Sequence, residues 1–178
     1  MEVFDMLVLG VEAAFALAGF AGIIATFQFG DAKKIRRLDA VGLSLIVKDS
    51  FSAAALCTLP MLLIVFQTNE STTWFLASLF AVIVLSYSMY GGYRLSRRAF
   101  KSKTFLLLFL LVLIVTSLIV FANILNAAGI VFNRKPGPVL MGAVWGLAIA
   151  AYSFTRLLLL PIWKTVRLME AADAGASA

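Results

Sequence analysis

The chain of 178 residues carries a formal net charge of +6, is 62% hydrophobic and has only 13% charged residues, against about 25% in an ordinary soluble domain. It has no histidine and one cysteine, Cys57, which excludes His-ligated haem, the usual zinc sites, an intramolecular disulfide and His-based acid/base catalysis. We therefore expect an all-α, polytopic membrane helical bundle with no cofactor and no metal. The basic residues lie almost wholly in short clusters beside apolar runs, which favours contact with anionic lipid headgroups and argues against nucleic acid as a partner.

Five apolar runs divide the chain, and each is long enough to cross a hydrocarbon core of about 30 Å with some tilt. The first run begins with acidic residues and is too long for a signal peptide, so we interpret it as a retained span. No linker separates the runs into units, and residues 1–178 are expected to form a single transmembrane domain. The expected spans cover about 3–29, 40–66, 73–95, 104–125 and 138–163.

The distribution of basic residues predicts the orientation of these five spans. Most basic residues fall on one side of the five-span arrangement, and only Arg134 and Lys135 fall on the other. The positive-inside rule then places the N-terminus outside and the C-terminus in the cytoplasm, with a default location in the cell inner (plasma) membrane. Trp74 and Trp163, at opposite ends of their spans, are expected to belong to the two interfacial aromatic belts. The tail after Trp163 is expected to extend the fifth helix briefly along the inner surface.

Lys48 and Asp49 are adjacent ionisable residues inside the second span. A charged side chain there costs about 2.5 to 3.5 kcal/mol on insertion scales, so a chain keeps one only where a partner or water receives it. Counting helical rise along the spans places Arg156 at the same depth as Asp49, in the cytoplasmic half. We therefore expect Asp49 to face Arg156. Lys48 points about 100° away and must find headgroups, another partner or water.

The same count predicts a polar layer at this depth, shared by the second, third and fifth spans. An interhelical clamp that fixes packing needs fewer assumptions than a gate or ion-binding element, and we prefer it for the Asp49–Arg156 pair. The expected members of the layer are Lys48, Asp49, Ser52, Tyr87, Tyr90, Tyr152, Ser153 and Arg156.

Glu12 lies in the first span, and no basic residue of the chain matches it in depth. It is either protonated and hydrogen-bonded, or it faces water or another subunit, and an unpaired carboxylate of this kind is a natural cation or proton site. Gly10, Ala14, Ala18 and Gly22 recur every fourth residue of the same span. Such spacing allows close approach of a neighbouring helix, so we expect tight packing of the first helix.

Other polar and aromatic positions have structural interpretations. Asn123 and Asn126 are expected to cap the end of the fourth helix, and Trp145 with Tyr152 to belong to the bundle core. Cys57 is expected to fill space as a small apolar side chain.

Three classes of function fit these features. The first is an ion or small-solute channel or transporter, homo-oligomeric because five helices alone enclose little space. Its pathway candidates are Glu12, Lys48, Asp49 and Arg156. The alternative is a non-catalytic structural or assembly subunit of a larger membrane complex. The third, an intramembrane enzyme acting on lipid or quinone, is ranked last because the chain has neither HExxH nor GxSxG, and we expect no enzyme.

Overall fold

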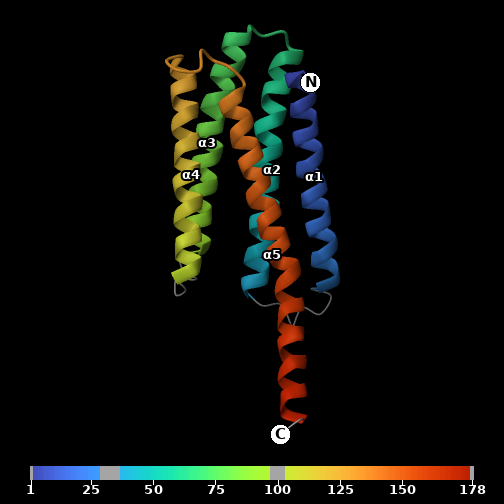
Figure 1. Cartoon of the computed structure of the whole chain (residues 1–178). Helices are drawn as coiled ribbons and strands as arrows, with labels where there is room; N and C mark the ends of the chain where they lie inside the picture. Colours follow the sequence, from blue (N-terminus) through green and yellow to red (C-terminus); the bar gives the residue numbers. More distant parts are fainter. Residues whose placement is uncertain (1, 29–36, 97–102, 177–178) are drawn as a thin grey trace.

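The computed structural model describes residues 2–28, 37–96 and 103–176, and in these ranges all regular structure is helical. The helices are α1 (Val3–Gln28), α2 (Arg37–Val65), α3 (Glu70–Ser96), α4 (Lys103–Ala128) and α5 (Gly137–Ala176). Each of these five is long and apolar enough to cross a membrane, which confirms the expected all-helical architecture with five candidate spans. The N-terminus lies at the end of the bundle with the α2–α3 and α4–α5 connections, termed here the short-turn end (Figure 1).

The helices extend beyond the apolar runs that predict them. α2 begins at Arg37 and α3 at Glu70, because charged residues continue a helix outside the apolar stretch. α5 continues to Ala176, and its last turns keep the direction of its own axis beyond the other helices (Figure 1). Many of the basic residues behind the predicted orientation lie outside the described residues, among them Lys33, Lys34, Arg36, Arg97, Arg98 and Lys101. The orientation therefore stays a prediction.

The two connections at the short-turn end are hydrogen-bonded turns. At the end of α2, Gln67 has a φ of 54°, and Thr68 N donates to the Leu63 carbonyl oxygen at 3.2 Å. At the end of α4, Gly129 has a φ of 73°, the left-handed region that glycine adopts without a steric penalty. The side chain of Asn69 begins α3, because its Oδ1 accepts the Ser71 N–H at 3.1 Å.

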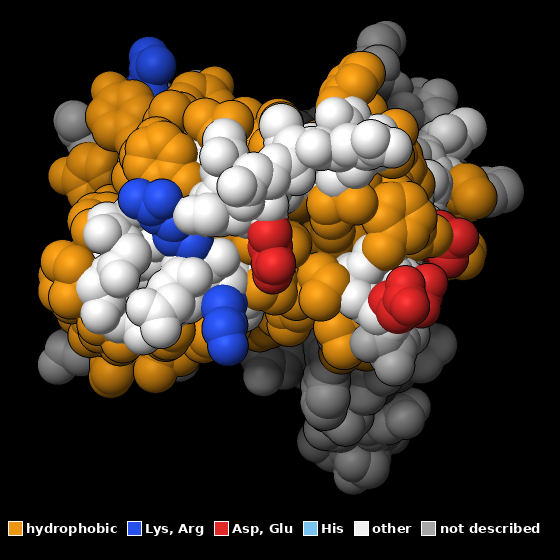
Figure 2. Space-filling model, turned by 90° about the horizontal axis from the view of Figure 1, so that it is seen from above, with side chains coloured by type: hydrophobic (Ala, Val, Ile, Leu, Met, Phe, Trp, Pro, Cys, Tyr) orange, Lys and Arg blue, Asp and Glu red, His pale blue; other side chains and the backbone are white. Residues whose placement is uncertain are grey.

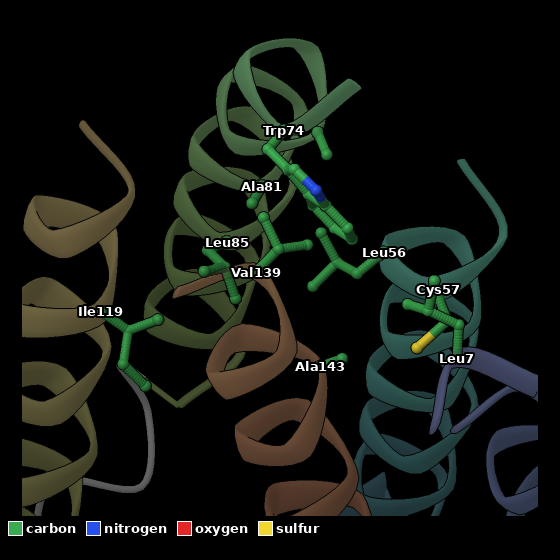
Figure 3. Close-up of a cluster of buried hydrophobic side chains, with 10 residues drawn as sticks. Leu7, Leu56, Cys57, Trp74, Ala81, Leu85, Ile119, Val139 and Ala143 are labelled. Carbon is green, nitrogen blue, oxygen red and sulfur yellow. The ribbon is translucent and has the colours of Figure 1, made fainter. Parts of the chain in front are cut away.

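Among the side chains that the structure describes, the buried cluster to which all five helices contribute lies near the short-turn end. Figure 3 shows Leu7 of α1 beside Cys57 of α2, with Ile119 of α4 on the far side of the same cluster. Further from the short turns, the buried clusters come from α1, α2 and α5, around Ala53 and around Ile46. In Figure 1, α3 and α4 accordingly run as a pair on one flank and α1 lies on the other.

Trp74 belongs to this core and not to an interfacial belt. It is 3% exposed and points from α3 into the apolar cluster (Figure 3), so the expected belt position of Trp74 is wrong. Trp74 and Ala81 are seven residues apart and therefore share the core-facing side of α3. The side chain of Trp163 lies outside the described residues.

Small residues set the closest helix contacts. A β-carbon at Gly10 of α1 would lie 2.6 Å from Cys57 Sγ of α2, and one at Gly146 of α5 would lie 3.3 Å from Ala53 Cβ. Ala14 is also buried, whereas Gly22 has open space around it. The first half of the predicted small-residue stripe thus packs against α2, and Cys57 fills space there as expected.

Figure 2 shows the short-turn end face-on. A few acidic and basic side chains lie among polar atoms there, and apolar side chains form most of the surrounding surface. This distribution is the one expected where a bundle emerges from an apolar environment.

Candidate functional site

Lys48 and Asp49 form a bonded cluster with Ser88 between α2 and α3. Ser88 Oγ donates to Asp49 Oδ1 at 2.8 Å, and Lys48 Nζ donates to the Ser88 carbonyl oxygen at 2.7 Å. Asp49 is buried at 6% exposure, and the Lys48 side chain is half-buried. Two adjacent ionisable residues of α2 therefore bind the same residue of α3, one through its hydroxyl group and the other through its backbone.

Two neighbours on α3 complete the surroundings of the Lys48 ammonium group. Its nitrogen lies 5.7 Å from the centroid of the Tyr87 ring, within the distance of a cation–π interaction. A β-carbon at Gly91 would lie only 2.6 Å from the same nitrogen. The missing side chain at Gly91 therefore makes room for the amine.

Among the described residues, Asp49 takes its hydrogen bond from Ser88 and not from Arg156. The expected Asp49–Arg156 pair is thus replaced by a contact between α2 and α3, and Arg156 is an exposed side chain of α5. Equal depth was the only basis for the expected pair. The contacts between α2 and α5 show that the expected equal depth is wrong, because a β-carbon at Gly42 would lie 3.6 Å from Leu157 Cδ1 and one at Gly146 would lie 3.7 Å from the Asp49 carbonyl oxygen. Arg156 is therefore level with Gly42 and not with Asp49, since a count from the ends of each apolar run does not fix how far one helix is shifted along its neighbour.

The other expected members of the polar layer are spread around the bundle. Ser52 and Ser153 are partly buried, whereas Tyr90 and Tyr152 are exposed. Tyr90 follows Ser88 by two residues and so points about 200° away from it on α3. Among the contacts of the described residues, those around Ser88 bring together Lys48, Asp49 and Tyr87 of the predicted layer.

A second polar network joins α3, α4 and α5 near the short-turn end. The sequence pattern points only to its two asparagines and not to their partners. Asn126 Nδ2 donates to Ser78 Oγ at 2.8 Å and to the Lys135 carbonyl oxygen at 2.9 Å, and Asn126 Oδ1 accepts the Lys135 N–H at 3.0 Å. Asn123 Nδ2 donates to the Pro138 carbonyl oxygen at 3.0 Å. The two asparagines therefore bind the connection and the neighbouring helices, a wider role than capping one helix.

Glu12 lies on the side of α1 that faces away from the other helices. The buried residues Leu7, Ala14 and Ala21 recur every seventh residue and so share one face of α1. Glu12 precedes Ala14 by two residues, a rotation of about 200°, and its side chain is exposed. Within Val3–Thr26, the stretch apolar enough to span a membrane, Glu12 lies about 4 Å from the midpoint.

The surface around Glu12 is open and partly built of small residues. Ala16 and Gly19 follow Glu12 by four and seven residues and therefore share its face, and a β-carbon at Gly19 would meet no atom within 4 Å. This surface is termed the outward face of α1, and it consists of Asp5, Leu9, Glu12, Ala16, Gly19 and Ile23, all of them exposed. It is separate from the Lys48–Asp49–Ser88 cluster.

Neither the cluster nor the outward face of α1 has the ligands of a metal centre. Within the part of the chain that the structure describes, no three histidine, cysteine, aspartate or glutamate side chains come together. The chain matches no protein-family model, no curated protein and no solved structure. The burial, position and contacts of Glu12, Lys48 and Asp49 are therefore the observations on which a function has to rest.

Proposed function

We propose that the protein is a homo-oligomer of the inner (plasma) membrane whose protomers meet through the outward face of α1 and form a pathway for a cation or a proton at Glu12. One observation carries the proposal: the Glu12 side chain is exposed near the midpoint of a spanning helix, on the side away from its own bundle. Intramembrane ionisable residues mark ion pathways and proton relays far more often than they mark lipid-facing surfaces.

A lone protomer would expose this carboxylate to the hydrocarbon interior. An ionised aspartate there costs about 2.5 to 3.5 kcal/mol on insertion scales, and a glutamate faces the same loss of hydration. A second α1 removes that exposure, because Ala16 and Gly19 let two helix backbones approach closely.

Two copies related by symmetry place their Glu12 carboxylates in one site. Like charges at short range cannot both remain ionised without a counter-charge, so the pair takes up a shared proton or a cation. Exchange of that proton or cation between the two sides of the membrane is the proposed activity.

Lys48 and Asp49 support the bundle in this proposal and do not line the pathway. Both are bonded to Ser88 within the protomer, which satisfies them without a transported ion. Their role is the clamp between α2 and α3 that holds the packing partner of α1 in place. Arg156 belongs neither to this cluster nor to the outward face of α1.

A structural or assembly subunit of a larger membrane complex is the second candidate. The internal bonding of Lys48 and Asp49 favours it, because a satisfied cluster leaves few groups for a transport path. In that case the outward face of α1 contacts a different membrane protein, which supplies a basic residue or a hydrogen-bond donor to Glu12.

Ion flux into proteoliposomes separates the two candidates. Purified protein is reconstituted into liposomes that contain a dye sensitive to the ion under test. The decay of an imposed proton or potassium gradient is then followed for the unmodified protein, Glu12→Gln and Glu70→Gln. We expect flux above protein-free liposomes, a loss of at least tenfold for Glu12→Gln, and no change for Glu70→Gln, whose carboxylate lies at the first residue of α3. Flux at the level of empty liposomes, or equal flux with Glu12→Gln, would contradict the pathway.

A further inference from the structure

A strip of basic and aromatic residues follows the outer edge of the α2–α3 contact, away from the short-turn end. On α3, Tyr87, Gly91 and Arg94 are spaced by four and three residues and share one face. On α2, Ser44 and Lys48 are one turn apart, and Lys48 reaches across to α3. Tyr87 is 69% exposed, and Ser44 and Arg94 are exposed as well. These five residues are termed the α2–α3 basic strip.

Lys48 has capacity for a further ligand. An ammonium group carries three N–H donors, and the bond to the Ser88 carbonyl oxygen uses one of them. The group lies where Gly91 has no side chain, next to the exposed Tyr87 ring, so it is reached from the outer surface of the helix pair. Any side chain at position 91 would occupy this place.

The strip reaches the level at which headgroups lie. Arg94 is the last residue of the α3 stretch that is apolar enough to span the membrane. Gly91 is three residues further in, about 5 Å along the helix axis. The two cations are therefore stacked along the membrane normal, one at the interface and one just below it.

We infer that the α2–α3 basic strip binds one anionic phospholipid. Arg94 contacts the phosphate, Lys48 contacts the phosphate or the ester carbonyl below it, and the Tyr87 ring packs on the first carbons of an acyl chain. Basic side chains near helix ends extend toward headgroups in this way and are attracted to anionic lipids.

The charge balance of the strip supports an anionic headgroup over a zwitterionic one. Asp49, which follows Lys48 on α2, is buried and receives a hydrogen bond from Ser88. The exposed charge of the strip is thus that of its two cations. Because Tyr87 presents an exposed apolar ring inside the span, the ligand carries hydrocarbon as well as a phosphate.

Native mass spectrometry of the purified protein with added phosphatidylglycerol or phosphatidylcholine tests the inference. We expect one phosphatidylglycerol per protomer to remain bound under activation that removes phosphatidylcholine. Arg94→Gln is expected to weaken this binding about fivefold, the equivalent of the roughly 1 kcal/mol that a basic residue contributes at an anionic membrane surface. Lys48→Met is expected to weaken phosphatidylglycerol binding at least as much. If Lys48→Met unfolds the protein, Arg94→Gln provides the test, because Arg94 lies at an exposed helix end.

Lys103→Gln is the matched control, because Lys103 begins α4 at the same end of the bundle. Equal losses for Arg94→Gln and Lys103→Gln would mean general attraction to a negative surface and would overturn the site. Equal retention of the two lipids would overturn it too. Displacement of the lipid by soluble glycerol phosphate at similar concentration would show a free phosphate site in place of a lipid site.

Discussion

Removing the Ser88 hydroxyl tests the cluster that joins α2 to α3. Ser88→Ala deletes the donor to Asp49 Oδ1 while the backbone bond from Lys48 can remain. A hydrogen bond to a charged group contributes about 1.5 to 3 kcal/mol in soluble proteins, whereas measured interhelical bonds in membranes average about 0.6 and reach about 1.7 kcal/mol. Because Asp49 is almost fully buried, we expect a loss near the upper membrane value, between about 1 and 2 kcal/mol.

A double-mutant cycle isolates this contact. Ser88→Ala, Asp49→Ala and the double variant are unfolded reversibly in mixed micelles, with the fluorescence of the three tryptophans as the signal. We expect a coupling energy of about 1 kcal/mol between positions 49 and 88. Ser52→Ala is the control on the same helix and should change stability by less than about 0.5 kcal/mol. Additive effects of the two changes, or an equal loss for Ser52→Ala, would refute the assigned contact.

Two further substitutions test the packing that positions α1 and α4. Gly10→Ala should lose about 1 to 3 kcal/mol of stability, because its β-carbon would lie 2.6 Å from Cys57 Sγ. Cys57→Ala in the same chain should restore most of the loss, and Gly22→Ala, with no atom within 4 Å of its β-carbon, should be neutral. Asn126→Ala should lose about 2 to 4 kcal/mol of stability in the same unfolding assay, because it leaves Ser78 and two backbone groups of Lys135 without their partner. A loss below about 0.5 kcal/mol would show that these hydrogen bonds do not stabilise the fold.

The lengths of the apolar runs were sufficient to predict the helices, because each run is long enough to span a bilayer by itself. They were not sufficient to predict which side of a helix faces the core. Trp74 shows the difference. Its position at the end of a span predicts a place in the interfacial aromatic belt, but its side chain lies on the face of α3 that packs into the core. The signal was present in the sequence, because Ala81 lies on the same face seven residues later.

The sequence predicts the candidate site only in part, because it shows where charge is costly but not which residues meet across helices. Lys48 and Asp49 stood out because charge inside an apolar run is costly, and the structure places them together with Tyr87. Their common partner Ser88 was missed, because a neutral residue next to Tyr87 gives no electrostatic signal. Arg156 is predicted from an estimated depth, and although α2 and α5 do pack together, their contacts place Arg156 level with Gly42 and not with Asp49. The exposure of Glu12 could not be read from composition, since it depends on which face of α1 packs against α2.

Disulfide crosslinking through the outward face of α1 tests the proposed self-association most directly. In a Cys57→Ala background, single cysteines are placed at Gly19, on the outward face, and at Leu118, an exposed position of α4, and membranes are oxidised before denaturing electrophoresis. We predict a dimer band for Gly19→Cys, its weakening when Glu12→Leu is added, and no dimer for Leu118→Cys. A monomer in every lane, or equal dimer from both positions, would contradict an interface at Glu12.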